Sequence, residues 1–268
     1  MAAITESEPI PSVKDLASSE SSIRRSALRA IVSHLNEREA TSPLTPTQSL
    51  QLWRGLYVAV YMHDSKNAIS VQNLITEVAG LLSVIAAKDK AISTSGGQDG
   101  VWLDTWTTAF WETISREWVS IDQWRMNKVL LLVRFFLREN LRLLFDAVAV
   151  DEPKSSAKSH EIVTRQVHVL ESWPLSPRER KVPDGLRLHV LDVWSDELLA
   201  QLEAATAAAA VQGGQESSSE SGENGVKNAL TGAAKLIMAP VEKISKEALS
   251  KGVKMRAKDA VKSFQESI

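Results

Sequence analysis

The chain has 268 residues, of which 44% are hydrophobic, and a formal net charge of -2 at pH 7. This apolar content is enough for a sizeable core, so the chain is not disordered as a whole. Because it has no cysteine, a disulfide framework, a cysteine zinc site and a thiol nucleophile are excluded, and a reducing compartment is favoured. The small net charge gives no overall attraction to polyphosphate, so any nucleic-acid contact requires a local basic patch.

The sequence indicates no export signal and no membrane span. Residues 1–14 carry Glu6, Glu8 and Pro9 where a signal peptide has a positively charged start and an apolar centre. The longest apolar run, residues 129–133, is far shorter than the roughly 20 residues that cross a bilayer. We therefore expect a soluble protein that has no membrane contact.

Apolar residues recur every three or four positions along most of the chain, which predicts helices and no strand. In chain order, the predicted helices cover residues 19–35, 46–63, 71–85, 102–118, 121–145, 162–173 and 186–210.

Two of these helices have predicted capping boxes at their starts. Thr45 is followed by Pro46 and Gln48, which is typical of an N-cap, a proline at the first helical position and a third-position amide. Ser120 and Gln123 have the same spacing and predict the start of the fifth helix. That helix is apolar nearly all round between residues 129 and 137, so it is expected to lie centrally.

The fourth predicted helix carries unusually large aromatic residues on one face. Trp102, Trp106, Phe110 and Trp118 follow the helical spacing. Side chains of this size favour deep burial, so this helix is expected to supply much of the core.

The alternation of helices and breaks predicts an all-α fold, an irregular stack of antiparallel helix pairs with a basic helical C-terminal tail. We expect a flexible N-terminus at residues 1–15 and a helical domain at residues 16–211. Residues 212–225 are rich in Gly, Ser and Glu and predict a flexible linker. Residues 226–268 keep helical spacing and predict a basic amphipathic tail, which Pro240 is expected to break or restart.

No residue pattern indicates a cofactor or metal site. His160 and His168 lie on one face of a predicted helix, but two imidazoles without a placed carboxylate make a poor metal site. Gly96, Gly97 and Gly100 lack the preceding strand and the following lysine of a phosphate-binding loop. We expect no catalytic residue, no metal, no cofactor and no small-molecule substrate.

A group of carboxylates in the fourth and fifth helices is the best candidate for acid and base chemistry. It contains Glu112, Glu117 and Asp122, with Arg116 and Arg125 beside them. A structural ion-pair network is the favoured interpretation, because such networks perturb carboxylates as readily as active sites do. A metal-dependent nuclease that uses Glu117 or Asp122 is the enzymatic alternative.

Two basic surfaces are candidates for binding RNA or a partner protein. Arg134, Arg138 and Arg142 are spaced i, i+4 and i+8 and form a ridge on the fifth helix, for which a solvated face is an equal alternative. The tail is the second surface, and its apolar side, with one aromatic residue, argues against membrane binding. Its candidate residues are Lys243, Lys246, Lys251, Lys254, Arg256, Lys258 and Lys262.

Several short segments together resemble a known family. They are LWRGL at 52–56, YMHDS at 61–65, FWETISREW at 110–118, IDQWRMNK at 121–128, LVR at 132–134 and PDGLRLH at 183–189 with Asp192. In this order they resemble the eukaryotic ribosomal RNA-processing protein 1 (Nop52-type) family. The resemblance implies a HEAT-like helical fold.

Within these segments, the conspicuous side chains have predicted architectural roles. Trp53, Trp111 and Trp118 are expected to be core anchors. Ion pairs are expected to fix the turn between two helices, and they involve Arg116, Glu117, Asp122, Arg125 and Lys128. The full set of family-signature residues expected to be structural is Trp53, Gly55, Asp64, Trp111, Glu117, Trp118, Asp122, Arg125 and Lys128.

The resemblance implies a non-enzymatic scaffold in the nucleolus of the nucleus. Such a protein assists early assembly of large (60S) ribosomal subunit precursors and is needed for precursor rRNA processing. Its expected partners are other assembly factors of the pre-60S particle, with precursor rRNA contacted through the basic surfaces. A general HEAT-like protein–protein adaptor unrelated to ribosomes is the alternative from another functional class.

Overall fold

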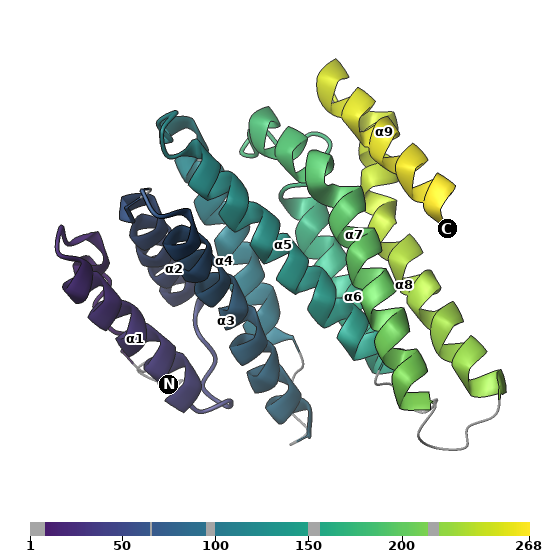
Figure 1. The fold of residues 1–268 in the computed structure, drawn as a ribbon, viewed down its shortest axis with the longest axis horizontal. Helices are drawn as coiled ribbons and strands as arrows, with labels where there is room; N and C mark the ends of the chain where they lie inside the picture. The colour runs from purple at the N-terminus through teal and green to yellow at the C-terminus, as the bar shows by residue number, and fades with distance from the viewer. Residues whose placement is uncertain (1–8, 65, 95–99, 150–155, 214–219) are drawn as a thin grey trace, which may run out of the picture. The chain divides into compact units, whose positions relative to one another are not determined.

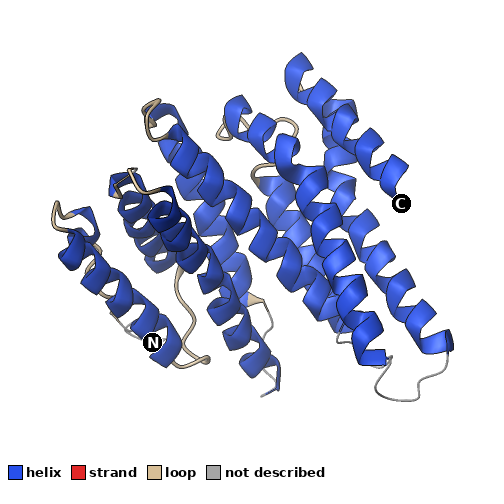
Figure 2. Ribbon diagram, in the orientation of Figure 1, coloured by secondary structure: helices blue, strands red, loops and turns tan. Residues whose placement is uncertain are grey.

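The computed structural model describes residues 9–64, 66–94, 100–149, 156–213 and 220–268. Within these ranges the chain forms helices joined by loops, and none of the described residues is in a strand (Figures 1 and 2). The predicted all-α class is confirmed, and the helices pack as a stacked array. The elements are η1 (Lys14–Ala17), α1 (Ser21–Glu37), α2 (Pro46–Met62), α3 (Ala68–Thr94), α4 (Val101–Glu117), η2 (Trp118–Ser120), α5 (Met126–Ala149), α6 (Ser156–Ser172), α7 (Asp184–Gly213), α8 (Glu220–Glu247) and α9 (Lys251–Ser267).

The chain divides into two compact units, residues 1–132 and residues 133–268. The division falls within α5, inside the segment 16–211 for which a single helical domain was predicted. Of the predicted linker 212–225, the described residues belong to the end of α7 and the start of α8. Residues 1–8 of the predicted flexible N-terminus and the glycines at 96 and 97 lie outside the described residues.

The core of unit 1 is an aromatic cluster between α2 and α4. Trp53 and Trp106 lie with ring centroids 4.9 Å apart, and Phe110 meets Trp53 edge-on at 4.8 Å. Trp111 contacts Phe110 at 4.8 Å in a similar T-shaped geometry. All four rings are buried. The spacing in the fourth predicted helix indicated this for Trp106 and Phe110, and the family signature indicated it for Trp53 and Trp111. Such edge-to-face pairs stabilise the packing beyond the area they bury.

The predicted start of α2 is confirmed in detail. The Thr45 hydroxyl accepts a hydrogen bond from the Gln48 N–H, and the Gln48 side chain accepts one from the Thr45 N–H, with Pro46 at the first helical position. About two turns after Gln48, Gly55 allows η1 to lie directly on α2. A Cβ at Gly55 would stand 2.8 Å from side-chain atoms of Val13 and Leu16.

α3 satisfies the length and composition of a membrane span over Ala68–Ile92. In the structure this helix packs against α4, and Ile75, Val78, Leu82 and Ile85 on its apolar face are buried within unit 1. Core helices of soluble proteins pass the same test.

Unit 2 contains α6, α7, α8 and α9, and the predicted tail is part of its packing. α8 contacts α6, α7 and α9, and α9 contacts α7. The apolar face of α8 buries Leu230, Ile237, Val241 and Ile244. Removing such surface from water is the main source of folding free energy, so α8 and α9 contribute to the stability of this unit.

The predicted break at Pro240 is wrong, because α8 continues through this residue. An interior proline costs a helix one hydrogen bond and some strain, about 3 kcal/mol. The buried residues on both sides of Pro240, Ile237 and Val241 among them, supply packing that offsets this cost.

Candidate functional site

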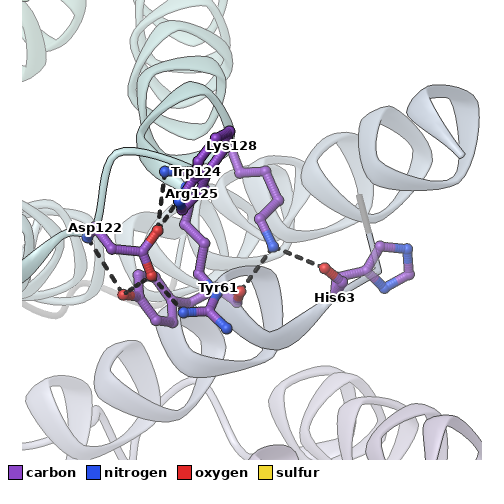
Figure 3. A network of polar contacts seen from close by, with 6 residues as sticks. All are labelled: Tyr61, His63, Asp122, Trp124, Arg125 and Lys128. Carbon is purple, nitrogen blue, oxygen red and sulfur yellow. Dashed lines mark hydrogen bonds and ion pairs between the residues drawn. The ribbon is translucent and has the colours of Figure 1, made fainter. Parts of the chain in front are cut away.

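Several polar residues of the predicted signature meet where α2 ends and α5 begins (Figure 3). Asp122 lies at the centre of this junction. Its Oδ2 accepts a hydrogen bond of 3.0 Å from the Tyr61 hydroxyl, and its Oδ1 accepts 3.0 Å hydrogen bonds from the N–H groups of Trp124 and Arg125. The Arg125 guanidinium pairs with Asp122 and lies over the Tyr61 ring, 4.6 Å from its centroid.

This geometry keeps the Asp122 carboxylate ionised. Desolvation works to raise the pKa of Asp122, but the hydrogen bonds from Tyr61 and Arg125 outweigh it, so the pKa lies below its ordinary value. A carboxyl group that acts as general acid or base at neutral pH needs a pKa raised above its ordinary value. The surroundings of Asp122 therefore suit a structural anion.

The predicted capping box of Ser120 and Gln123 is wrong. The Ser120 hydroxyl donates to the Glu117 carbonyl at 2.7 Å, and α5 begins at Met126. Asp122, rather than Ser120, stabilises the turn before α5. Its short carboxylate accepts hydrogen bonds from the N–H groups two and three residues ahead of it. The spacing rule identified a cap in the right loop but assigned it to the wrong side chain.

Lys128 joins the start of α5 to the end of α2. Its side chain is buried, and its Nζ donates hydrogen bonds of 2.7 Å to the carbonyls of Tyr61 and His63. The last carbonyls of a helix lack partners within the helix and attract a cation. The prediction that Lys128 forms an ion pair is thus corrected: it caps α2. Burial, and after it the charge of Arg125, lowers the pKa of Lys128.

The other signature residues in unit 1 have different surroundings. Trp53 and Trp111 are buried as predicted, whereas Trp118 is only partly buried at the start of η2, so its prediction as a core anchor is wrong. Asp64 is exposed, and its Oδ1 accepts a hydrogen bond from the Lys66 N–H.

The predicted ion pairs around α4 are rearranged in the structure. Arg116 pairs with Glu112, one turn back on α4. The side chain of Glu117 is partly buried at the end of α4. Its charge contributes, after burial, to raising the pKa of Tyr57.

The junction also presents two apolar side chains that sequence reasoning did not single out. Trp124 is 81% exposed and Val119 is 85% exposed, while the backbone N–H of Trp124 is held by Asp122. Exposed tryptophan on a fixed turn is typical of a protein–protein contact, because ordering it on binding costs little entropy. Periodicity gave no signal for this exposure, since Trp124 lies in a turn and Val119 in the short η2.

The predicted arginine ridge of α5 lies in unit 2 and is paired with carboxylates. Glu197 of α7 is 2% exposed; its carboxylate receives Arg134 Nε at 2.5 Å and Arg138 Nε at 2.8 Å. Arg142 pairs with Glu139 and with Asp146, at 2.9 and 2.7 Å. The charges of the three guanidiniums are balanced by three carboxylates, so the ridge has a structural role that neither the ligand-binding prediction nor its alternative of a solvated face had included.

Glu197 was not anticipated from the sequence, since nothing local marks it as the partner of arginines on another helix. Burial works to raise the pKa of Glu197, but the hydrogen bonds from Arg138 and Arg134 outweigh burial and hold it below the ordinary glutamate value. The carboxylate is therefore ionised and binds α7 to α5 within unit 2.

The candidate residues of the predicted tail fall into two groups. Lys243 pairs with Glu171 at 3.6 Å and Arg256 with Asp192 at 2.9 Å, so these two cations attach α8 and α9 to α6 and α7. The other candidates lie on the outer surface. Lys254 is partly exposed, and the rest are exposed: Lys246, Lys251, Lys258 and Lys262.

Histidine and acidic side chains form no metal-binding cluster in the part of the chain that the structure describes. No group of three or more His, Cys, Asp or Glu side chains there is placed to hold a metal ion. His160 and His168 are both exposed on α6.

Comparison with known proteins agrees with the signature. The family model described as the nucleolar protein Nop52 matches residues 7–267. Ribosomal RNA processing protein 1 homolog B of Homo sapiens is 30% identical over 201 residues, and its Mus musculus counterpart is 27% identical over 201 residues. Both alignments cover 74% of this chain but only 23% and 24% of the relatives.

The Drosophila melanogaster ribosomal RNA processing protein 1 homolog is 28% identical over 160 residues, which is 58% of this chain and 19% of that protein. The chain thus spans about a quarter or less of the length of these curated relatives. The family match takes in both units and every described helix, which confirms the resemblance seen in the sequence: this chain belongs to the Nop52 family of nucleolar proteins.

Proposed function

We propose that this chain acts as a non-enzymatic scaffold in nucleolar precursors of the large ribosomal subunit and is needed for precursor rRNA processing. The observation that carries the proposal is the family match over residues 7–267. The relatives named as ribosomal RNA processing proteins align with most of this chain, so the processing role is carried over from them to this helical portion.

The polar residues of the signature support a role without catalysis. Asp122 and Arg125 hold the turn before α5, and Lys128 caps α2. In this arrangement the charges are used to join helices, and the carboxylate pKa is lowered, away from the range that suits acid and base catalysis. A junction that is held by these contacts suits a protein that positions others.

Two surfaces are available to partners in such a particle. The junction presents Trp124 and Val119 to solvent, and an apolar anchor of this kind fits another assembly factor. The outer lysines of α8 and α9 offer positive charge to precursor rRNA. The proposal therefore includes partner proteins at the junction. An RNA contact at the C-terminal helices is a separate part of it, which the scaffold role does not require.

The test is depletion of the protein from its own cells, combined with purification of the tagged chain. Depletion should cause spacer-containing precursor RNA to accumulate and mature large subunits to fall, while small-subunit levels change less. The tagged wild-type chain should bring down large-subunit assembly factors and precursor rRNA. Normal processing after depletion, or a purified set without ribosomal components, would reject the scaffold and leave the general helical adaptor.

A matched pair of variants sharpens the purification. Trp124→Ala removes the exposed anchor, and Val211→Ala removes an apolar side chain that is 71% exposed on α7. The first should reduce recovery of assembly factors, whereas the second should not. Equal recovery with both variants would exclude the junction as a docking surface.

A further inference from the structure

Four lysines of α9 lie on the side of the helix that faces away from its buried residues, whereas Arg256 reaches Asp192 of α7. The inner face of α9 buries Val253, Ala257, Ala260 and Phe264, and the helix contacts α7 and α8. At 3.6 residues per turn, the positions i, i+3, i+7 and i+11 share one side of a helix. Those positions hold the lysines at 251, 254, 258 and 262, which we call the α9 lysine face.

The lysine face is a continuous row of positive charge about 16 Å long, given a rise of 1.5 Å per residue. Lys251 and Lys258 are exposed, and Lys254 is partly exposed. Among the residues that the structure describes, these three have no carboxylate within 4 Å; Lys262 has Glu266 at 3.7 Å, an exposed pair. Exposed pairs of this kind contribute little, so all four ammonium groups are available to an anionic ligand.

This face differs in kind from the other cations that the sequence suggested. The arginine ridge of α5 is neutralised by carboxylates, and Lys243 and Arg256 attach their helices to acidic residues of α6 and α7. Residues 226–268 carry nine basic and four acidic side chains, a net charge of +5, while the whole chain carries -2. The positive charge of the protein is therefore concentrated here.

A second group of cations lies near the start of α9, on the α6–α7 loop. A hollow of about 330 Å³ is lined by the α6–α7 loop and by the turn before α9. Arg178 and Arg180 line it and are exposed. The two carboxylates in the lining are engaged: Glu179 accepts from the Lys181 N–H, and Asp184 pairs with the buried Arg187.

We propose that the α9 lysine face binds the phosphate backbone of RNA without reading its sequence. Phosphate contacts are made chiefly by lysine and arginine, whereas protein–protein interfaces are depleted in lysine and enriched in aromatic residues. The lysine face carries no aromatic side chain, and its exposed apolar residue is Met255. Without an aromatic ring on which bases stack, the contact is to phosphates. This inference rests on the proposed function for the source of the RNA.

The experiment measures binding of the full chain to a fluorescein-labelled, single-stranded RNA of 20 nucleotides by fluorescence anisotropy, between 50 and 200 mM salt. The test variant changes all four lysines of the face to Gln. The control variant changes Lys66, Lys90, Lys158 and Lys227 to Gln; these four are also exposed, so net charge falls equally. A third variant replaces the lysine face with Arg, which keeps the charge.

Each phosphate contact with single strands contributes about 0.7 to the slope of log K against log salt. The Gln variant of the face should therefore lower the magnitude of the slope by about 2 to 3 and weaken binding at least ten-fold at 100 mM salt. The control and Arg variants should bind like the wild type, and a polyuridine probe should bind like a mixed sequence.

Equal losses in the face and control variants would overturn the inference, because net charge alone would then explain binding. Loss of RNA binding in the Arg variant would also overturn the inference. So would a Gln variant of the face that binds RNA like the wild type but no longer recovers an acidic assembly factor from purified particles. Failure of the inference is separable from failure of the proposed function. If the wild type recovers large-subunit precursors but does not bind RNA through α9, only the inference fails; RNA binding without such recovery rejects only the scaffold.

Discussion

Trp111→Ala is the substitution whose effect on folding follows most directly from the structure. The Trp111 side chain is 1% exposed and packs edge-on against Phe110. An aromatic side chain buries roughly 150–250 Å², which at about 25 cal/mol per Å² corresponds to about 4–6 kcal/mol. This area-based figure is an upper bound, because unfolded chains keep part of their surface buried. We expect the substitution to lower the free energy of unfolding by about 3–5 kcal/mol.

The assay is urea unfolding of the full chain, followed by circular dichroism at 222 nm so that loss of a tryptophan does not alter the signal. Trp124→Ala is the matched control in the same unit. Since Trp124 is 81% exposed, its truncation should change the free energy of unfolding by less than about 0.5 kcal/mol. Equal effects of the two substitutions, or a cost below about 1 kcal/mol for Trp111→Ala, would refute the assignment of Trp111 to the core.

Three further substitutions test separate features. Gly55→Ala places a Cβ 2.8 Å from side chains of η1 and of the residue before it. We expect a lower free energy of unfolding, because the overpacking cost of about 1–3 kcal/mol should exceed the gain of about 1 kcal/mol in helix propensity. Faster amide hydrogen exchange in η1 would follow, and unchanged protection would contradict this. Tyr61→Phe removes a donor to Asp122, so the pKa of Asp122 should rise in an NMR titration; an unchanged value would show that the hydroxyl is not a determinant. Glu197→Gln should lower the free energy of unfolding by about 1–3 kcal/mol at pH 7. The pKa of Glu197 is depressed in the folded state, so its contribution to the free energy of unfolding is fully present above the ordinary glutamate pKa of about 4.3. This contribution is lost as pH falls through the folded pKa. The difference in unfolding free energy between Glu197→Gln and the wild type should therefore narrow in acid. Glu203→Gln, at an exposed position of α7, should show neither effect.

Local features of the sequence predicted most helices of this protein correctly. The capping box at Thr45 and Gln48 formed as expected, because its donors and acceptors lie within four residues of each other. The aromatic spacing of the fourth helix likewise predicted its buried face, apart from Trp118 at its end. Where local rules failed, tertiary packing or a competing side chain was the reason, as at Pro240 and at Asp122.

The roles of individual charges were harder to predict than the helices. Lys128 was expected to pair with a carboxylate, yet it caps a helix whose last carbonyls belong to residues more than sixty positions earlier. Arg134 and Arg138 were candidates for binding a ligand, with a solvated face as the equal alternative, and in the structure they share the carboxylate of Glu197. Periodicity indicates which face of a helix a charge occupies, but not what lies opposite that face.

The sequence by itself determined the helical class, the family and the concentration of positive charge near the C-terminus, because these depend on spacing and composition along the chain. The tertiary structure decided which of the charges remain available. Tyr61 and Asp122 are 61 residues apart, and Arg134 and Glu197 are 63 apart. Contacts over such separations are set by how helices pack. Packing leaves Lys251, Lys254 and Lys258 of α9 without a carboxylate within 4 Å among the described residues, while the arginines of α5 are neutralised.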